Sequence, residues 1–231
     1  MKTFLYAALI GVLVGCSPAQ RETETTTTET VASATENTTT ETAAPSATGT
    51  AASQENSMTD TAKVAEIKTT RGDITIRFFP DVAPNHVKNF IDLAQKGFYN
   101  GTKFHRVIPG FMIQGGDPNT KSGSPDTWGM GGSETRLKAE FNTVSHKRGI
   151  VSMARSQDPN SASSQFFIVV KDSPFLDNQY TVFGQVTKGM EVADAIVNAP
   201  KGAQDRPNDP VSITSITIRD ANDAEKGPAP R

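Results

Sequence analysis

The stretch Phe104-His105-Arg106-Val107-Ile108-Pro109-Gly110-Phe111-Met112-Ile113-Gln114-Gly115-Gly116-Asp117 determines how this chain is interpreted. Within nine residues it contains one arginine, Arg106, two large apolar side chains, Phe111 and Met112, and one amide, Gln114. A guanidinium group keeps its charge at any working pH and presents a rigid fork of N–H donors. An aromatic ring and an adaptable methionine can line an apolar slot. The stretch therefore predicts a site that holds a small apolar ring beside a fixed cation.

Two further motifs follow later in the chain. Ser164-Gln165-Phe166-Phe167-Ile168 offers a second amide and more aromatic surface. Because strand alternation points neighbouring side chains to opposite faces, we expect Phe166 in the core and Phe167 on the opposite face. The run Met153-Ala154-Arg155 adds a small residue and a second cation.

In their order and length, these motifs resemble the cyclophilins, the peptidyl-prolyl cis-trans isomerases, from about Ala62 to Asp220. The resemblance implies rotation about the peptide bond that precedes proline, with no cofactor. Turning that bond breaks its resonance, against a barrier of about 18–20 kcal/mol. A slot for the proline ring, a donor that meets the proline nitrogen and polar groups that hold the flanking chain would lower this barrier.

The resemblance also implies a role for each site residue. Arg106 becomes the catalytic residue beside the substrate proline, and Gln114 orients Arg106 or bonds the peptide carbonyl. Ala154 leaves room for the residue before proline, and the backbone of Arg155 pairs with the peptide. The implied substrate-binding residues are Phe111, Met112, Gln114, Ala154, Arg155, Gln165, Phe167, Phe175, Leu176 and Tyr180.

Three of these positions depart from the eukaryotic pattern. Phe175 stands where many eukaryotic cyclophilins have tryptophan, so the indole N–H is lost and we expect weak cyclosporin binding. Tyr180 stands where many have histidine, and Arg155 replaces a common asparagine. We expect isomerisation to survive the loss of the indole N–H at Phe175. The rival hypotheses are a non-catalytic proline-peptide binding module or holdase chaperone, and a structural envelope protein; the intact Arg106 favours the enzyme.

The resemblance and the pattern of the chain together predict the fold class. It is mainly β: a closed eight-stranded antiparallel β-barrel capped by two α-helices, as in cyclophilins. Ile74, Ile76 and Phe78 alternate with polar residues, and Arg71-Gly72-Asp73 suits the turn of a hairpin. Pro84 opens a helix whose apolar stripe runs to Ala94. The expected strands are 64–69, 74–79, 104–107, 112–115, 149–154, 165–169, 182–186 and 211–218, and the second helix is 191–198.

The chain begins like an exported lipoprotein. Lys2 precedes the apolar run Phe4 to Val14, which is too short to cross a bilayer but fits a signal peptide. Leu13-Val14-Gly15-Cys16 resembles a bacterial lipobox, in which the lone Cys16 would be lipidated. We expect a chain anchored in the bacterial cell envelope, at the outer membrane facing the periplasm in a Gram-negative host because Ser17 is not aspartate. An ordinary signal peptide with an incidental cysteine, or an uncut anchor, is the alternative.

Composition then divides the chain into four parts. Residues 1–15 are the signal peptide, and residues 16–60 are a Thr/Ser/Ala/Glu-rich segment that lacks the apolar side chains to fold, hence a disordered tether. Residues 61–221 form the domain, and residues 222–231 form a flexible C-terminal tail. The expected partners are proline-containing unfolded or extended polypeptides and, through the anchor, the membrane.

Other functional classes lack support in the sequence. The net charge is −2 and no cluster of basic residues is interleaved with aromatics, so we expect no nucleic acid partner. His86, His105 and His146 lack metal-ligand spacing, so we expect no metal and no cofactor. We interpret His105 as a packed, hydrogen-bonded residue, Trp128 as a packing anchor and residues 129–132 as a mobile loop beside the groove. We expect a monomer.

Overall fold

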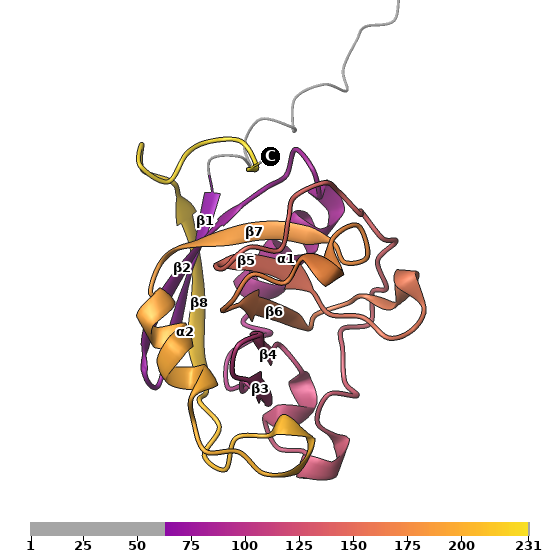
Figure 1. Ribbon diagram of the computed structural model, residues 1–231, viewed down its shortest axis with the longest axis vertical. Helices are drawn as coiled ribbons and strands as arrows, with labels where there is room; N and C mark the ends of the chain where they lie inside the picture. Colours follow the sequence, from indigo (N-terminus) through magenta and orange to yellow (C-terminus); the bar gives the residue numbers. More distant parts are fainter. Residues whose placement is uncertain (1–62, 231) are drawn as a thin grey trace, which may run out of the picture. The chain divides into compact units, whose positions relative to one another are not determined.

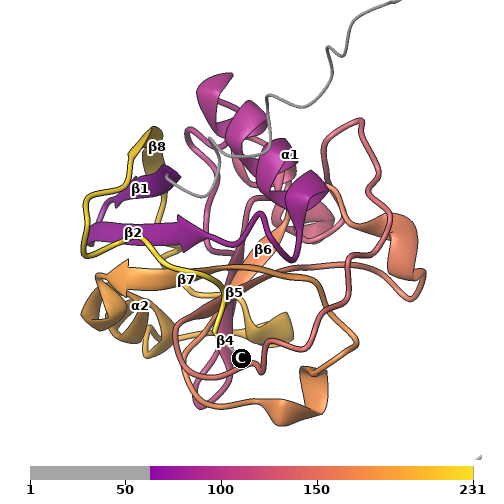
Figure 2. The same ribbon diagram turned by 90° about the horizontal axis from the view of Figure 1, so that it is seen from above.

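The computed structural model describes residues 63–230. The predicted signal peptide, the tether and Cys16 lie outside these residues. Figures 1 and 2 show a strongly curled sheet with α1 and α2 on different sides of it. In the described residues, no helix has the length and hydrophobicity needed to cross a membrane.

The fold begins with the expected hairpin. β1 (Lys63–Thr69) pairs antiparallel with β2 (Gly72–Phe78), and Ile67 lies opposite Ile74. Gly72 in the turn has a φ of 129°, which only glycine adopts without strain. Ile74, Ile76 and Phe78 are buried as predicted, but Thr75 between them is buried too, so the predicted alternation holds only in part.

A single antiparallel sheet holds eight strands in the order β3-β4-β6-β5-β7-β2-β1-β8. Residues 106–115 supply one end of the sheet and the two ends of the domain supply the other. The remaining bounds are β3 (Arg106–Ile108), β4 (Met112–Gly115), β5 (Ile150–Met153), β6 (Phe166–Val169), β7 (Val182–Lys188) and β8 (Ile213–Asp220).

The prediction of a closed barrel is wrong, because the sheet stays open between β3 and β8. β3 has only three residues and ends just before Pro109, which has no N–H to extend a ladder. The residues ahead of β3 meet the start of β8 through one isolated bridge, Lys103 to Ser212, and short backbone contacts such as Phe104 N–H to the Val211 carbonyl at 3.0 Å. The sheet is therefore a curled, open barrel.

The main core lies between the sheet and α1 (Pro84–Gln95). The helix begins at Pro84, as predicted, and its ring Phe90 contacts the rings of Phe78, Tyr99, Phe166 and Phe183 at centroid distances of 4.9–5.6 Å. α2 (Met190–Val197) packs against β2 and β4. Phe166 is fully buried here, which confirms its expected place in the core.

A second, smaller apolar cluster lies on the other face of β4 and β6. Its buried members include Met112, Phe167 and Leu176, and Phe111 and Tyr180 pack against it while partly exposed. The two faces of β6 therefore serve different clusters: Phe166 belongs to the main core and Phe167 to the smaller one. The smaller cluster is the base on which the functional site is built.

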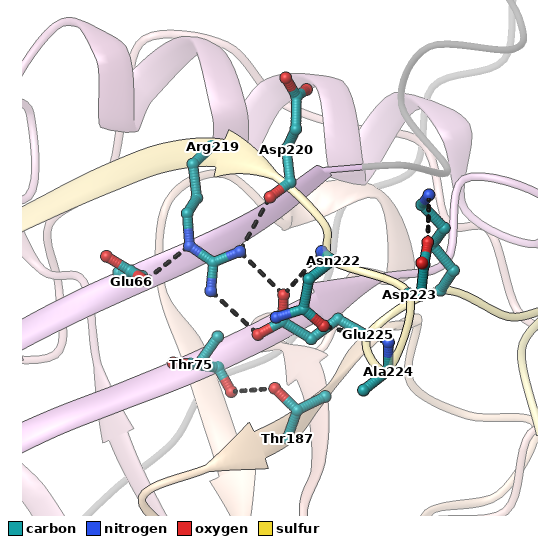
Figure 3. Close-up of polar contacts among 10 residues, drawn as sticks. Glu66, Thr75, Thr187, Arg219, Asp220, Asn222, Asp223, Ala224 and Glu225 are labelled. Carbon is teal, nitrogen blue, oxygen red and sulfur yellow. Dashed lines mark hydrogen bonds and ion pairs between the residues drawn. The ribbon is translucent and has the colours of Figure 1, made fainter.

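Residues 222–225, the start of the tail predicted as flexible, make defined contacts near the end of the sheet (Figure 3). Glu225 is buried and accepts two hydrogen bonds from the Arg219 guanidinium, at 2.8 and 2.9 Å. Arg219 also donates to Glu66 of β1 at 2.6 Å. The paired Arg219 lowers the pKa of Glu225 to about 2. This network joins the C-terminal segment to β8 and β1.

Candidate active site

The residues singled out from the sequence line a cavity of about 740 Å³. All of the predicted site residues between 106 and 180 lie on its wall except Gln165. Gln165 lines an adjoining cavity of about 540 Å³, which shares Gln114, Ala154 and Arg155 with the first. The motifs that are separated in the sequence therefore meet at one place.

Strand register explains why they meet. Arg106 of β3 lies opposite Gln114 of β4, Gln114 lies opposite Phe167 of β6, and Phe167 lies opposite Ser152 of β5. Residues directly opposite one another in antiparallel strands place their side chains on the same face of the sheet. Met112 shares that face because it lies two residues from Gln114. The cation, the amide and the apolar slot form one row across the sheet.

The floor of the slot is apolar and the rim is aromatic. Met112, Phe167 and Leu176 are almost completely buried, whereas Phe175 is 63% exposed. The ring of Phe175 lies 5.3 Å from that of Phe111, centroid to centroid. Such a cavity combines a fixed apolar base with a more accessible edge, and it can receive a compact ring while the rest of a bound chain remains outside.

Arg106 reaches the cavity from its polar side. Its Nε lies 3.8 Å from a carboxylate oxygen of Asp205, and the Arg106 side chain is 44% exposed. The Nζ of Lys201 lies 2.7 Å from the other oxygen of Asp205. The guanidinium of Arg106 is therefore partly exposed to solvent in the free cleft.

The two glutamines form a chain of hydrogen bonds. The Gln114 amide donates to the Gln165 side-chain oxygen at 2.9 Å, and the Gln165 amide donates to the carbonyls of Gly129 and Gly131 at 3.0 and 2.7 Å. The glycine-rich loop thus lies beside the groove, where it was expected. The Gln114 amide thus donates its hydrogen bond to Gln165. Arg106, which Gln114 was expected to orient, has Asp205 as its nearest ionic partner.

A buried polar network lies behind the slot. His146 contacts the Ser152 hydroxyl through Nε2 at 2.9 Å and Asp177 through Nδ1 at 2.9 Å. The His146 ring is nearly parallel to that of Phe167, with the centroids 6.2 Å apart. Burial lowers the pKa of His146 despite the nearby Asp177. Ser152 and His146 are completely or almost completely buried and do not line the cavity, so this set supports Phe167 rather than acting as a hydrolytic triad.

Comparison with known proteins decides the family. Residues 64–218, more than half of the chain, match the family model described as cyclophilin type peptidyl-prolyl cis-trans isomerase/CLD. This chain belongs to the cyclophilins. Its activity is that of a peptidyl-prolyl cis-trans isomerase, as the resemblance implied.

Individual relatives of this cyclophilin agree with the family. A probable peptidyl-prolyl cis-trans isomerase of Brucella abortus is 44% identical over 172 residues, which cover 71% of this chain and 87% of the relative. A peptidyl-prolyl cis-trans isomerase of Acinetobacter baylyi is 42% identical, over 70% and 88% of the two chains. A solved cyclophilin type isomerase from Cryptosporidium parvum aligns with a TM-score of 0.63 at 33% identity, over 68% of this chain and 98% of that one.

The cyclophilin cavity also contains residues that we did not predict from the sequence. Gln204, Asp205 and Arg206 line it from a segment where Gln204 and Asp205 have φ values of 60° and 57°. No periodic pattern marks such a loop, so the sequence gives no signal for its position. Gln179 also lines the cavity, next to the predicted Tyr180.

Trp128 and His105 also line this cavity. Trp128 donates to the Gly123 carbonyl at 3.0 Å, and its ring lies 5.6 Å from the Lys103 ammonium and 5.5 Å from the Arg206 guanidinium, which suits a packing anchor. His105 is buried, as expected, but neither of its ring nitrogens has a hydrogen-bond partner in the described part of the chain. Burial lowers the pKa of His105 and favours the neutral ring.

Proposed function

We propose that Arg106 lowers the barrier to rotation by donating a hydrogen bond to the proline nitrogen, while the pyrrolidine ring occupies the slot above Met112 and Phe167. The supporting observation is the row of side chains that brings Arg106, Gln114 and Phe167 to one cavity. When the bond twists, the nitrogen lone pair localises and becomes a better acceptor, so a donor fixed at this point stabilises the transition state more than the ground state.

The glutamines would hold the chain on either side of the proline. Gln165 fixes the Gln114 amide, which leaves the Gln114 oxygen as an acceptor for the peptide or for Arg106. A Cryptosporidium parvum relative, 34% identical with a TM-score of 0.62, was crystallised in the presence of the dipeptide Ala-Pro. We therefore propose short proline-containing segments of extended polypeptides as the substrate class. A bound chain would also cover Arg106 and remove the water around it.

The experiment compares the wild type with Arg106→Ala and with a matched control, Arg71→Met. Arg71 is exposed in the turn between β1 and β2, far along the sheet order from β3. Loss of one preorganised donor costs roughly 10²–10³ in kcat, so Arg106→Ala should lose about that factor in a proline isomerisation assay. The control should retain the wild-type rate. Undiminished turnover by Arg106→Ala would remove Arg106 from the mechanism.

We also propose that this isomerase works from a lipid anchor in the bacterial cell envelope and assists the folding of exported proteins. The support is the lipobox-like Leu13-Val14-Gly15-Cys16 and the Thr/Ser/Ala/Glu-rich spacer that follows. If about 45 spacer residues behave as a random coil, they would span roughly 35–40 Å. Mass spectrometry of the mature amino terminus tests the anchor: it should begin at a diacylglyceryl-modified Cys16, and Cys16→Ser should release the domain from membranes.

A further inference from the structure

One arginine connects the two sides of the cavity without an acidic partner. The Arg155 guanidinium donates to the Gln179 carbonyl from Nε at 3.2 Å and from Nη2 at 3.0 Å. Its Nη1 donates to the carbonyls of Ser156 and Gln157 at 2.9 and 3.3 Å. Among the described residues, no carboxylate lies within 4.0 Å of it as an ion-pair partner. Its N–H donors are therefore used mainly on backbone carbonyls.

The same guanidinium lies over the ring of Tyr180, with its central carbon 4.6 Å from the ring centroid. Tyr180 in turn meets Phe167 edge to face, with the centroids 5.7 Å apart. Phe167 is the aromatic part of the slot floor. A continuous set of contacts therefore runs from Arg155 through Tyr180 to the surface on which the substrate ring would rest.

The end of a strand explains why a side chain is needed here. At the end of β5, the Met153 N–H donates to the Thr181 carbonyl at 3.0 Å, and the Ala154 N–H donates to the Gln165 carbonyl on the opposite side at 2.9 Å, as alternate N–H groups of a strand with two neighbours do. Beyond this point the backbone of the β5 segment no longer pairs with the segment that leads into β7. The long side chain of Arg155 reaches Gln179 and continues the connection.

We propose that Arg155 is a positioning residue, which holds the wall formed by Tyr180 at the spacing that receives the proline ring. Its planar face stacks on Tyr180 and its fork of donors binds the Gln179 carbonyl. The proposal rests on the assignment of the slot made above and adds a residue that sets its width. Arg155 acts through the wall, not by placing its charge on the substrate.

This role predicts a particular pattern in kinetics. A wall that holds the ring acts equally before and during rotation, so its loss weakens binding and leaves the rate of the bound complex almost unchanged. Lysine should not replace Arg155, because an ammonium has neither a planar face nor a fork of donors. A role that depends on charge alone would be kept by lysine.

The experiment measures KM and kcat, together with Kd for a short Ala-Pro peptide, for Arg155→Met, Arg155→Lys and the control Arg71→Met. We expect both Arg155 variants to raise KM and Kd about fivefold, equivalent to about 1 kcal/mol, with kcat within about twofold of the wild type. A wild-type KM in Arg155→Lys alone would show that the positive charge, not the planar guanidinium, is what matters. A wild-type KM in both variants would show that Arg155 does not hold the wall of the slot. Either result would overturn the proposal.

Substitutions of the partner give a second test that leaves Arg155 in place. Tyr180→Leu removes the ring face on which Arg155 stacks and should raise KM as Arg155→Met does. The double variant Arg155→Met/Tyr180→Leu should raise KM no further than either single variant does, because both substitutions remove the same contact. Strictly additive effects would contradict the contact. Activity that does not depend on Arg106 would instead count against the proposed role of Arg106. The KM and Kd comparisons for Arg155 and Tyr180 would still test whether Arg155 positions the wall.

Discussion

Single side chains in this cyclophilin act through the partners that strand register gives them. Ser152 illustrates this, because it lies opposite Phe167 and its hydroxyl is the partner of His146 Nε2 at 2.9 Å. The pattern of the sequence could not identify this set, since Asp177 lies 31 positions from His146 in the chain. What the sequence could predict were the residues of the slot itself, because Phe111, Met112 and Gln114 are adjacent in one motif.

Ser152→Ala tests the support behind the slot. The change leaves His146 Nε2 buried without a partner, and a buried unsatisfied polar group costs roughly 1–3 kcal/mol. We expect the free energy of unfolding in urea to fall by about this amount. Ser124→Ala, at an exposed serine, is the matched control and should unfold like the wild type. Equal stability of the two variants would mean that the hydrogen bond is unimportant.

At the scale of elements, helix α1 depends on a distant carboxylate. Ala83 before the helix offers no side-chain cap, and Glu140 accepts instead from the backbone N–H groups of Asn85 at 3.1 Å and His86 at 3.0 Å. A carboxylate at a helix N-terminus satisfies free donors and complements the helix dipole. Although burial opposes it, hydrogen bonding from His86 and Asn85 lowers the pKa of Glu140.

Glu140→Ala should therefore lower the free energy of unfolding by about 0.5–2 kcal/mol, the range for lost N-caps. Glu140→Gln should lose less, because its amide oxygen can still accept from one N–H. Chemical denaturation checks the order, with Glu134→Ala at an exposed position as the control. The prediction fails if glutamine is as destabilising as alanine or if alanine has no effect.

Elements also show how far sequence reasoning extends. The start of α1 at Pro84 and the β1–β2 hairpin followed from local pattern and are confirmed. The cap from Glu140 did not follow, because Glu140 lies 54 positions from His86 in the chain and the two meet only in the folded protein. The same limit applies to Asp205, whose left-handed backbone places it beside Arg106. Barrel closure was predicted incorrectly because β3 is too short to pair along β8. Its length is limited by Pro109 and by the residues around Pro109 in the folded chain.

At the scale of the whole molecule, acid should destabilise the fold in two stages. Burial lowers the pKa values of His86, His105 and His146 from 6.5, so below that value the unfolded chain binds more protons than the folded one. Stability then rises with pH in this range and falls on acidification. Glu225, whose pKa falls from 4.5 to about 2, contributes stability above 4.5 that is lost as the pH drops towards 2.

Urea unfolding at a series of pH values checks this order. The wild type should lose stability first as the pH falls below about 6.5 and again below about 4.5. Glu225→Gln should be less stable at neutral pH and should show a flatter second stage, since its side chain cannot titrate. The contacts of Glu225 would be unimportant for stability if the variant reproduced the wild-type curve.

The central claim is that Arg106 stabilises the twisted bond rather than the bound substrate, and exchange spectroscopy on an Ala-Pro peptide tests it most directly. Nuclear magnetic resonance separates the interconversion rate of the bound peptide from its affinity. For Arg106→Ala we predict an interconversion rate that falls roughly 10²-fold or more, with Kd changed only a few-fold. A variant that binds far more weakly but turns the bound peptide at the wild-type rate would contradict this claim.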